Sequence, residues 1–531
     1  MTQHSGMRYR ILIGGGLALG LWLLLTIALR ISVAAAQPIE TVDQPRADHA
    51  QPITRTLSVR ALPAAPTATI QRAAGNYFVY LPVISRPPAP PLPPPARAAF
   101  FVQPDAKTGS ASIAVDEHGG LHLAYADYLP FADHPAAVYL YCAPGANCAN
   151  GSSWHGVALA DYVNEVQLTL TRGGQPRLLI RAQSQTAGYE WDYIYAECNQ
   201  TCTDPNQWAG DFISASFGTS IFDINDGTSP QRSFALDRQD RPRFIYQDRN
   251  YLLEPDHIGA FYLACDANCA SALNWTETQI SQSNGTASYE VFEYPSLAFT
   301  ADGRPRVAAM INTLAGELAF FYVECDTNCD AAAQWQRVKL FERDSGSKVS
   351  WDIELDQLDR PRIAFFKGST LDNTGDKLYY AACNSDCLNE AAWQKLNLGL
   401  GTGMGKHPDL EFNPQGQPRI AYIRNQGDGL GYAWCDSNCE GNVGNWHATP
   451  IETASVLDAE YPVVRPPHCN AGLWSSLSPV LSLDTGGHAR VAYDAVYDTQ
   501  CWYDDPNDGL PPYLVWQQLW HSVRGVIFPQ P

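Results

Sequence analysis

The stretch Asp409–Trp446, DLEFNPQGQPRIAYIRNQGDGLGYAWCDSNCEGNVGNW, contains every feature of a unit that recurs along the chain. A short alternating run is followed by a turn with Asn, Pro and Gly, and then by a second run that opens with Pro-Arg. A third, aromatic run leads into two cysteines separated by three residues, and a tryptophan follows. Alternation of this kind is typical of strands, and the Asn/Gly punctuation is typical of hairpin turns. The unit therefore predicts four short antiparallel strands.

The same order of features returns at near-constant intervals. The cysteine pairs are Cys142 and Cys148, Cys198 and Cys202, Cys265 and Cys269, Cys325 and Cys329, Cys383 and Cys387, and Cys435 and Cys439. The tryptophans that follow them are Trp154, Trp208, Trp275, Trp335, Trp393 and Trp446. A seventh unit lacks the pair and runs its third strand, YLVWQQ, into a fourth, WHSVRGVIF, which contains Trp520.

A repeat of this length with four strands per unit predicts an all-β fold, a seven-bladed β-propeller over residues 98–531. A closed ring also protects the strand edges. An open β-solenoid and two stacked sandwiches are the alternative architectures.

The unit D-x-x-G-x-P-R-I-A-Y, followed by an aromatic strand and a tryptophan, resembles the tandem repeats of secreted bacterial β-propellers with BNR- or sialidase-like blades. The resemblance covers roughly residues 100–530 and implies the fold. The sialidase Asp box, S-x-D-x-G-x-x-W, is not reproduced, because the tryptophan lies in the fourth strand, far from the Asp-Gly turn. The resemblance therefore implies no catalytic residue.

All 14 cysteines lie in the repeat region, and the two outside the six pairs are Cys469 and Cys501. An even count at short spacings predicts disulfides and an oxidising compartment. Zinc is the alternative, but each pair supplies two of the four ligands that a structural zinc site needs. The formal net charge of −20 argues against nucleic acids and anionic membrane surfaces as partners.

The first 36 residues resemble an export signal. Arg8 and Arg10 precede the apolar stretch 11–29, and small residues end at Ala36. This pattern predicts a signal peptide or an N-terminal membrane anchor, the only expected contact with a membrane. Residues 37–97 are rich in Ala and Pro and predict a disordered linker or stalk. We therefore expect a secreted or cell-surface protein.

In a propeller, the loops that join strand four to the next strand one share a face with those that join strands two and three. Ligands commonly bind to such loops. The Cys469–Cys501 pair is expected to brace two of them, in a region rich in aromatic and acidic residues that suit sugar rings and hydroxyl groups. The candidate ligand-binding residues are Trp474, Tyr497, Trp502, Asp504, Trp191 and Tyr251. The alternative is that these aromatic residues pack the loops on themselves.

The innermost strands of units five and six differ from the others. Most units have small or uncharged residues there, whereas these two have Asp352 with Glu354 and Asp409 with Glu411. Four carboxylates near one channel need a counter-charge or protons. Ion pairs with Arg, a bound cation such as calcium, or an acid/base pair for glycoside chemistry are the three interpretations.

The Arg that opens each second strand is expected to be structural and to pair with turn acids such as Asp240, Asp302 and Asp359. With no complete catalytic set, the main hypothesis is a non-catalytic propeller that binds glycan or extracellular protein through its loop face. The alternatives are a glycoside hydrolase or polysaccharide lyase that uses the carboxylates of units five and six, and a structural surface protein.

Overall fold

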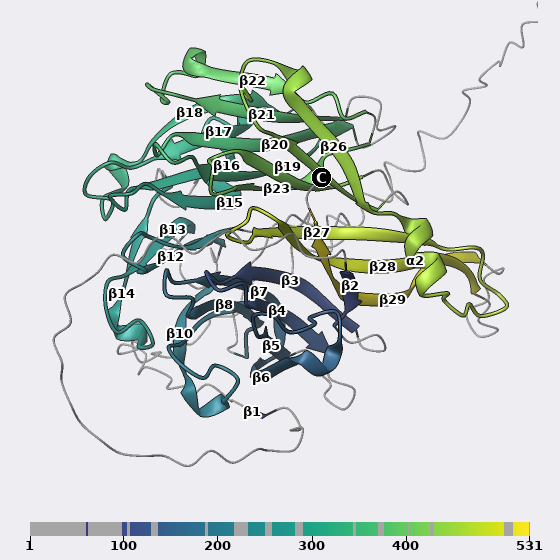
Figure 1. Ribbon diagram of the computed structural model, residues 1–531. Helices are drawn as coiled ribbons and strands as arrows, with labels where there is room; N and C mark the ends of the chain where they lie inside the picture. The colour runs from purple at the N-terminus through teal and green to yellow at the C-terminus, as the bar shows by residue number, and fades with distance from the viewer. Residues whose placement is uncertain are drawn as a thin grey trace, which may run out of the picture. The chain divides into compact units, whose positions relative to one another are not determined.

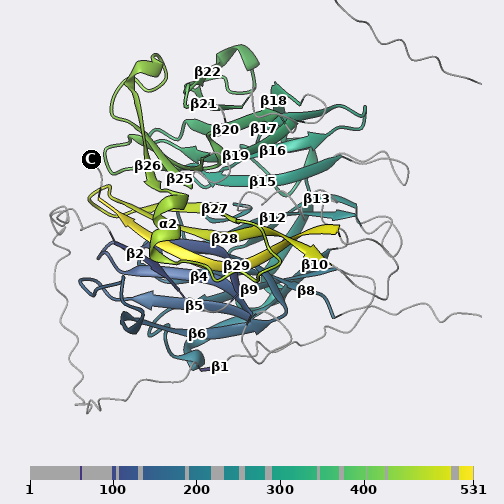
Figure 2. The same ribbon diagram turned by 90° about the vertical axis from the view of Figure 1, so that its right-hand side faces the viewer.

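The computed structural model describes residues 60–61, 98–102, 107–128, 136–185, 190–216, 232–249, 258–281, 290–343, 347–369, 376–401, 403–424, 429–503 and 513–529. Their strands form seven antiparallel sheets (Figures 1 and 2). The innermost strand of each sheet contacts the innermost strand of the next, and the seventh contacts the first. The fold is therefore a seven-bladed β-propeller, as the sequence predicts. The predicted signal segment and nearly all of the linker lie outside the described residues.

In the first three blades the chain runs from the innermost strand to the outermost. These blades contain β3 (Lys107–Val115), β4 (Leu121–Tyr128), β5 (Ala136–Cys142) and β6 (Trp154–Asp161); β7 (Val163–Leu170), β8 (Pro176–Gln183), β9 (Trp191–Cys198) and β10 (Trp208–Ser216); and β11 (Phe234–Leu236), β12 (Pro242–Arg249), β13 (Ile258–Cys265) and β14 (Trp275–Gln279). The short β1 (Arg60–Ala61) pairs with β6.

Blades four to six repeat this order. They contain β15 (Val291–Phe299), β16 (Pro305–Asn312), β17 (Leu318–Glu324) and β18 (Gln336–Glu342); β19 (Ser347–Leu355), β20 (Pro361–Ser369), β21 (Lys377–Cys383) and β22 (Trp393–Asn397); and β23 (Lys406–Phe412), β24 (Pro418–Ile423), β25 (Leu430–Cys435) and β26 (Trp446–Glu452).

The seventh blade is completed by the other end of the chain. It contains β27 (Leu473–Leu483), β28 (Ala489–Tyr503) and β29 (Tyr513–Phe528), and its outermost strand is β2 (Ala98–Phe101). The prediction of a separate fourth strand at WHSVRGVIF is wrong, because this segment continues β29 and pairs with both β28 and β2. Joining the first and last segments in one sheet closes the ring, and β2 in place of β29 forms the outer edge of the blade.

Each blade is held to the next by an aromatic contact. A tyrosine from the third strand of one blade meets the repeat tryptophan of the next, with ring centroids 5.0–5.3 Å apart. These pairs are Tyr139–Trp208, Tyr195–Trp275, Tyr262–Trp335, Tyr322–Trp393 and Tyr380–Trp446. At the seventh blade Phe528, and not Trp520, meets Tyr432, and Phe100 of β2 meets Trp154.

All fourteen cysteines form disulfides, six within the local pairs and one between Cys469 and Cys501. In every local pair the second cysteine accepts a hydrogen bond through its carbonyl oxygen from the indole Nε1 of the following tryptophan, at 2.8–3.0 Å. The fourth residue of the five tight pairs has a left-handed backbone, which explains the Asn or Asp found in four of them; the fifth has Thr201. The disulfide turn and the tryptophan are therefore one structural motif.

The shared arginines also belong to this motif. Arg306, for example, donates to the Cys325 carbonyl oxygen at 3.2 Å and to the Asp326 carboxylate at 2.7 Å. Equivalent bonds occur at Arg177, Arg243, Arg362 and Arg419. The role is structural, as expected, and the partner is the Asp or Asn immediately after the first cysteine.

The predicted pairing with turn acids is wrong for the three acids named, but Asp237, Asp356 and Asp484 at the start of their turns do pair with the shared Arg243, Arg362 and Arg490, at 2.7–3.2 Å. Asp240 and Asp359 instead accept backbone hydrogen bonds from Arg172 and Ala301 in the turns of the preceding blades. Asp302 pairs with Arg304, two residues further along the chain. Asp302 therefore stabilises its own turn, whereas Asp240 and Asp359 join neighbouring blades.

A helix and a long hairpin extend the seventh blade. The helix α2 (Ala454–Glu460) precedes β27, and β28 and β29 run 15 and 16 residues, longer than any other strand in the described part of the chain (Figure 1). The expectation that Cys501 and Trp502 lie in a loop is wrong, since β28 continues to Tyr503. Among the described residues, no helix is long and apolar enough to cross a membrane.

Candidate functional site

A belt of hydrogen bonds joins the seven innermost strands. At each junction a backbone N–H of one inner strand donates to an oxygen of the preceding blade. The acceptors are Ser112, Gln167, the carbonyl of Arg232, Ser296, Asp352, Asp409 and Ser482. Asp352 and Asp409 therefore occupy belt positions that blades one and four fill with serine, and part of their role is structural.

The four inner-strand acids surround one guanidinium. Arg232 comes from blade three and forms an ion pair with Asp409 of blade six. Its nitrogens lie 3.3 Å from Glu411, 3.6 Å from Glu354 and 3.9 Å from Asp352. The guanidinium also donates to the Leu481 carbonyl oxygen at 3.3 Å. One side chain thus links blades three, five, six and seven.

One positive charge does not neutralise four carboxylates. Burial, together with Glu411 and Asp352 nearby, raises the pKa of Glu354 well above its usual range. Burial also raises the pKa of Asp409 and of Glu411, although Arg232 opposes both shifts. Burial alone would lower the pKa of Arg232, but the four carboxylates raise it well above the ordinary value. The cluster therefore holds a permanent cation and favours bound protons.

This arrangement bears on the three interpretations from the sequence. Among the described residues, the one group of three potential metal ligands with all donor atoms within 4.8 Å is His468, Cys469 and Cys501. The channel carboxylates form no such group, because they are spread around Arg232. Glu354 and Glu411 keep 30% of their side-chain surface exposed, whereas Asp352 and Asp409 are buried. The two glutamates are the carboxylates that a further cation would reach.

Two of the candidate ligand-binding aromatics are buried. Trp474 and Tyr497 pack edge to face at 5.4 Å between ring centroids, and their exposed fractions are 1% and 6%. The Tyr497 hydroxyl accepts a hydrogen bond from the Gly472 backbone N–H. In this structure the two rings hold the segment before β27 against β28, and neither ring face is open to a ligand.

Trp502 belongs to an open aromatic surface on the β28–β29 hairpin. It lies opposite Leu514, and Gln500, two residues before it, lies opposite Trp516. Residues paired in this way point to the same side of a two-stranded ribbon. Trp502, Leu514 and Trp516 are 52%, 42% and 68% exposed. We call this side the aromatic face.

Polar side chains complete the aromatic face. Asp498 lies opposite Gln518. Burial raises the pKa of Asp498, although His521 and Gln518 oppose the shift. Leu473 of β27 lies opposite Asp498 on its other side and is 55% exposed. The face therefore combines flat apolar rings with amide and carboxylate groups.

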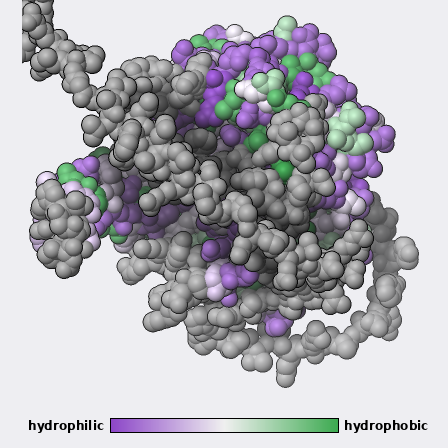
Figure 3. All heavy atoms as spheres, turned by 180° about the vertical axis from the view of Figure 1, so that it is seen from behind, coloured by the Kyte–Doolittle hydropathy of each residue, from purple (hydrophilic) through white to green (hydrophobic). Residues whose placement is uncertain are grey.

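The concentration of apolar surface on this hairpin is local. Ten large hydrophobic side chains of the described residues are exposed, and six of them lie on or beside the hairpin: Leu473, Trp502, Tyr503, Tyr513, Leu514 and Trp516. In the view of Figure 3, the described surface is mostly hydrophilic, with apolar residues in small scattered groups. An apolar patch on an otherwise polar surface marks an interaction site.

Trp191 does not join this surface. Trp191 begins β9 in blade two, where the Arg181 guanidinium stacks on its ring at 4.9 Å and pairs with Glu165 at 3.1 Å. Tyr251 and Asp504 lie outside the described residues. Arg232, Trp516 and Leu514 were not among the residues predicted from the sequence. For Trp516 the sequence does contain a signal. If the segment YLVWQQLW is interpreted as an alternating strand, the spacing of its tryptophans shows which side of the strand they share.

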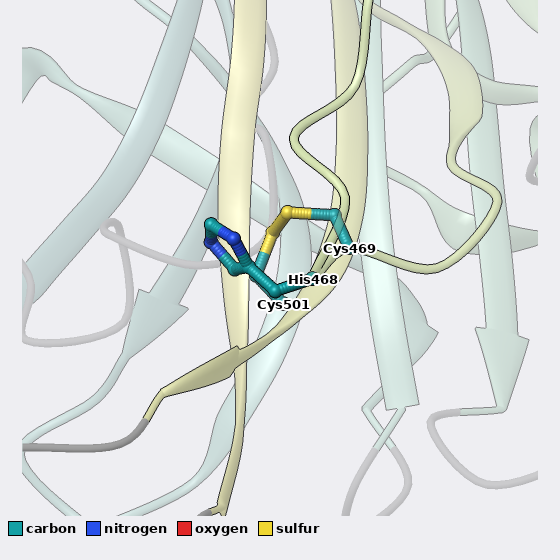
Figure 4. Close-up of side chains that lie close together, drawn as sticks. All are labelled: His468, Cys469 and Cys501. Carbon is teal, nitrogen blue, oxygen red and sulfur yellow. A yellow bond between two sulfur atoms is a disulfide. The ribbon is translucent and has the colours of Figure 1, made fainter.

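The Cys469–Cys501 disulfide lies beside the exposed His468 (Figure 4), and Cys501 directly precedes Trp502 in β28. The carbonyl oxygen of His468 accepts a hydrogen bond from the Trp502 backbone N–H at 2.9 Å. The disulfide therefore connects the segment before β27 to the strand that carries Trp502.

No family model matches the chain, and no curated protein matches its sequence. Solved structures show distant similarity. A protein of unknown function from Dyadobacter fermentans is 9% identical, with a TM-score of 0.41, and the alignment covers 82% of this chain and 99% of that one. The GH93 α-L-arabinofuranosidase of Fusarium graminearum is 10% identical, with a TM-score of 0.39 and coverage of 62% and 92%.

The Penicillium chrysogenum α-L-arabinanase is 12% identical, with a TM-score of 0.41 and coverage of 64% and 99%. Similarity at this distance says nothing about the activity of this chain, and its fold is established by its own seven sheets.

Proposed function

We propose that the protein is an exported recognition propeller that binds a neutral glycan on its aromatic face and that is not an enzyme. The observation that carries the proposal is the pair of exposed tryptophans, Trp502 and Trp516, diagonal to one another on the two-stranded ribbon. Two flat rings on one side of a ribbon suit the apolar C–H faces of sugar rings. Their large contact area costs little conformational entropy on binding.

The polar residues of this face favour a glycan over an apolar ligand. Gln500 and Gln518 offer both donors and acceptors, and Asp498 offers acceptors, so all three suit sugar hydroxyl groups. Trp502, Leu514, Trp516 and these three residues include no Lys or Arg, and the whole chain has a net charge of −20. A neutral glycan is therefore favoured over a sulfated or uronic acid polymer.

The contacts of the channel acids support a non-catalytic role. Glycoside hydrolysis needs two carboxyl groups that face the substrate, about 5 to 10 Å apart. Here Arg232 contacts all four carboxylates, and the two aspartates accept backbone hydrogen bonds within the belt. These contacts suit a structural cluster.

Export is supported by the seven disulfides, since disulfides persist in oxidising compartments. The resemblance of the repeat to secreted bacterial propellers agrees with this location. The cell-surface or secreted protein would display its aromatic face to polysaccharides outside the cell.

The proposal is tested by a glycan-array screen of the folded protein. The wild type is expected to bind neutral glycans, and Trp502→Ala/Trp516→Ala to lose those signals while keeping the wild-type circular dichroism spectrum. Binding that persists in this variant, or binding by neither protein, would contradict the proposal.

A further inference from the structure

Three potential ligands for a transition metal lie close together: His468, Cys469 and Cys501. One nitrogen of the His468 ring and the two sulfur atoms all lie within 4.8 Å of one another (Figure 4). In the oxidised protein the sulfurs are bonded to each other and do not act as thiolate ligands. We propose that reduction of this disulfide creates a site for a single zinc ion, held by His468, Cys469 and Cys501.

The backbone keeps the two cysteines together without help from the sulfur–sulfur bond. Cys469 and Cys501 form an antiparallel β-bridge. On one side of it the Asn470 N–H donates to the Gln500 carbonyl at 2.8 Å, and on the other the Trp502 N–H donates to the His468 carbonyl at 2.9 Å. Reduction therefore leaves two thiols facing one another on a fixed backbone.

Two thiolates and one imidazole are a ligand set that zinc accepts. Zinc–sulfur bonds are about 2.3 Å and zinc–nitrogen bonds about 2.0 Å, so tetrahedral ligand atoms lie roughly 3.3–3.8 Å apart. Small side-chain rotations bring the three donor atoms into this range. A water molecule would fill the fourth position, as in zinc sites with three protein ligands. His468 is exposed, Cys469 is half-buried and Cys501 is buried, so the ion would approach from the side of His468.

The chemistry is balanced by a thiol reductant. Two thiol groups of the reductant lose two electrons and two protons and form a disulfide, while the Cys469–Cys501 bond accepts both and becomes two thiols. Zinc binding then releases the two thiol protons to solvent and leaves the imidazole neutral. Binding is therefore tighter at higher pH and needs no further co-reactant.

The six local disulfides differ from the Cys469–Cys501 disulfide because they lack a third metal ligand nearby in the part of the chain that the structure describes. Within the described residues, none of them lies in a group of three clustered metal ligands. After reduction each would offer two thiolates at most. His468 is the residue that distinguishes the proposed site, and its exposed side chain allows replacement without disturbing the core.

The test uses the full-length protein, treated with a limiting dithiol reductant, desalted without oxygen and titrated with Co²⁺. Cobalt bound to thiolates gives visible absorption that zinc abolishes on displacement. Opened disulfides are mapped by alkylation and mass spectrometry. We expect one Co²⁺ per reduced chain and no binding to the oxidised chain. Cys265→Ser/Cys269→Ser, which removes one local pair, should bind as the wild type does.

His468→Ala should weaken Co²⁺ binding by about 100-fold or more, because loss of even an outer partner of a ligand costs about 10–100-fold. Cys469→Ser/Cys501→Ser should abolish it. The proposal is overturned if either variant binds Co²⁺ like the wild type. It is equally overturned if the reductant opens the local pairs while the Cys469–Cys501 bond remains intact.

Discussion

Arg232 of the third blade forms an ion pair with Asp409 of the sixth, 177 residues further along the chain. Three more carboxylates share the same guanidinium, so a single arginine offsets only part of the charge of the four channel acids. The inner strands of four blades depend on this contact, because Asp409 also accepts the Leu481 backbone N–H and Arg232 donates to the Leu481 carbonyl.

Replacement of Arg232 by methionine should destabilise the propeller by about 3–5 kcal/mol at neutral pH, since it leaves buried carboxylates without their cation. The free energy of unfolding, measured with urea, checks this. The loss should shrink at acidic pH, where the carboxylates bind protons. Arg238→Met, which removes an exposed arginine, is the control and should cost less than about 1 kcal/mol. Equal effects of the two variants would show that the cluster is not structural.

The raised pKa of Glu354 determines how the free energy of unfolding changes with pH. Its pKa is raised above the unfolded value by burial and by Glu411 and Asp352, so the folded protein binds its proton more tightly than the unfolded chain does. The stability from this group is complete below the unfolded pKa, about 4.3, and is lost as pH rises through the folded pKa. Glu354→Gln should therefore be more stable than the wild type at pH 8, by about 1 kcal/mol or more.

The measurement for this variant is urea unfolding across the pH range, with the exposed Glu117→Gln as the control. A Glu354→Gln protein that is less stable than the wild type at pH 8 would mean that the ionised carboxylate is the favoured form.

The prediction of calcium at Asp352, Glu354, Asp409 and Glu411 has its own test. Calcium would compete with protons at the two partly exposed glutamates, so its addition should raise the melting temperature more at pH 8 than at pH 6. Glu354→Gln/Glu411→Gln should show no calcium-dependent change. A wild type whose melting temperature is the same with calcium and with chelator at both pH values would refute the prediction.

The repeat made most of the fold predictable. The hairpin turns, the Pro-Arg strands and the cysteine–tryptophan motif recur in phase, so local pattern and global topology agree. The seventh blade was the exception. Its outermost strand is Ala98–Phe101, and these four residues lie far in sequence from the rest of the blade and carry no repeat signal.

The channel acids stood out because they broke the pattern of the inner strands, and the structure brings them around one arginine. Arg232 itself was not predictable, since it occurs once, just outside a strand, and reaches its partners through the ring. For Trp474 and Tyr497 the sequence suggested a binding site that the structure does not show. Their aromatic and acidic neighbours suggested a binding loop, but burial depends on packing against β28 that composition does not reveal.

Closure of the ring by Ala98–Phe101 predicts a sharp difference between two truncations. Removal of residues 1–97 should leave the melting temperature of the propeller nearly unchanged. Removal of residues 1–102 should lower the free energy of unfolding by about 3 kcal/mol or more, because Phe100 and Phe101 are buried against Trp154 and Trp520. Identical thermal unfolding of the two proteins would show that β2 does not close the ring.

The central claim, glycan recognition by the aromatic face, is tested most directly by isothermal titration calorimetry with a neutral oligosaccharide identified on the array. Trp502→Ala/Trp516→Ala is compared with Tyr503→Ala/Tyr513→Ala, which removes two exposed rings from the opposite side of the same hairpin. We predict that the tryptophan variant loses affinity by about 30-fold or more, as expected for anchor residues, while the tyrosine variant stays within about threefold of the wild type. Full affinity in the tryptophan variant, or loss only in the tyrosine variant, would contradict the account.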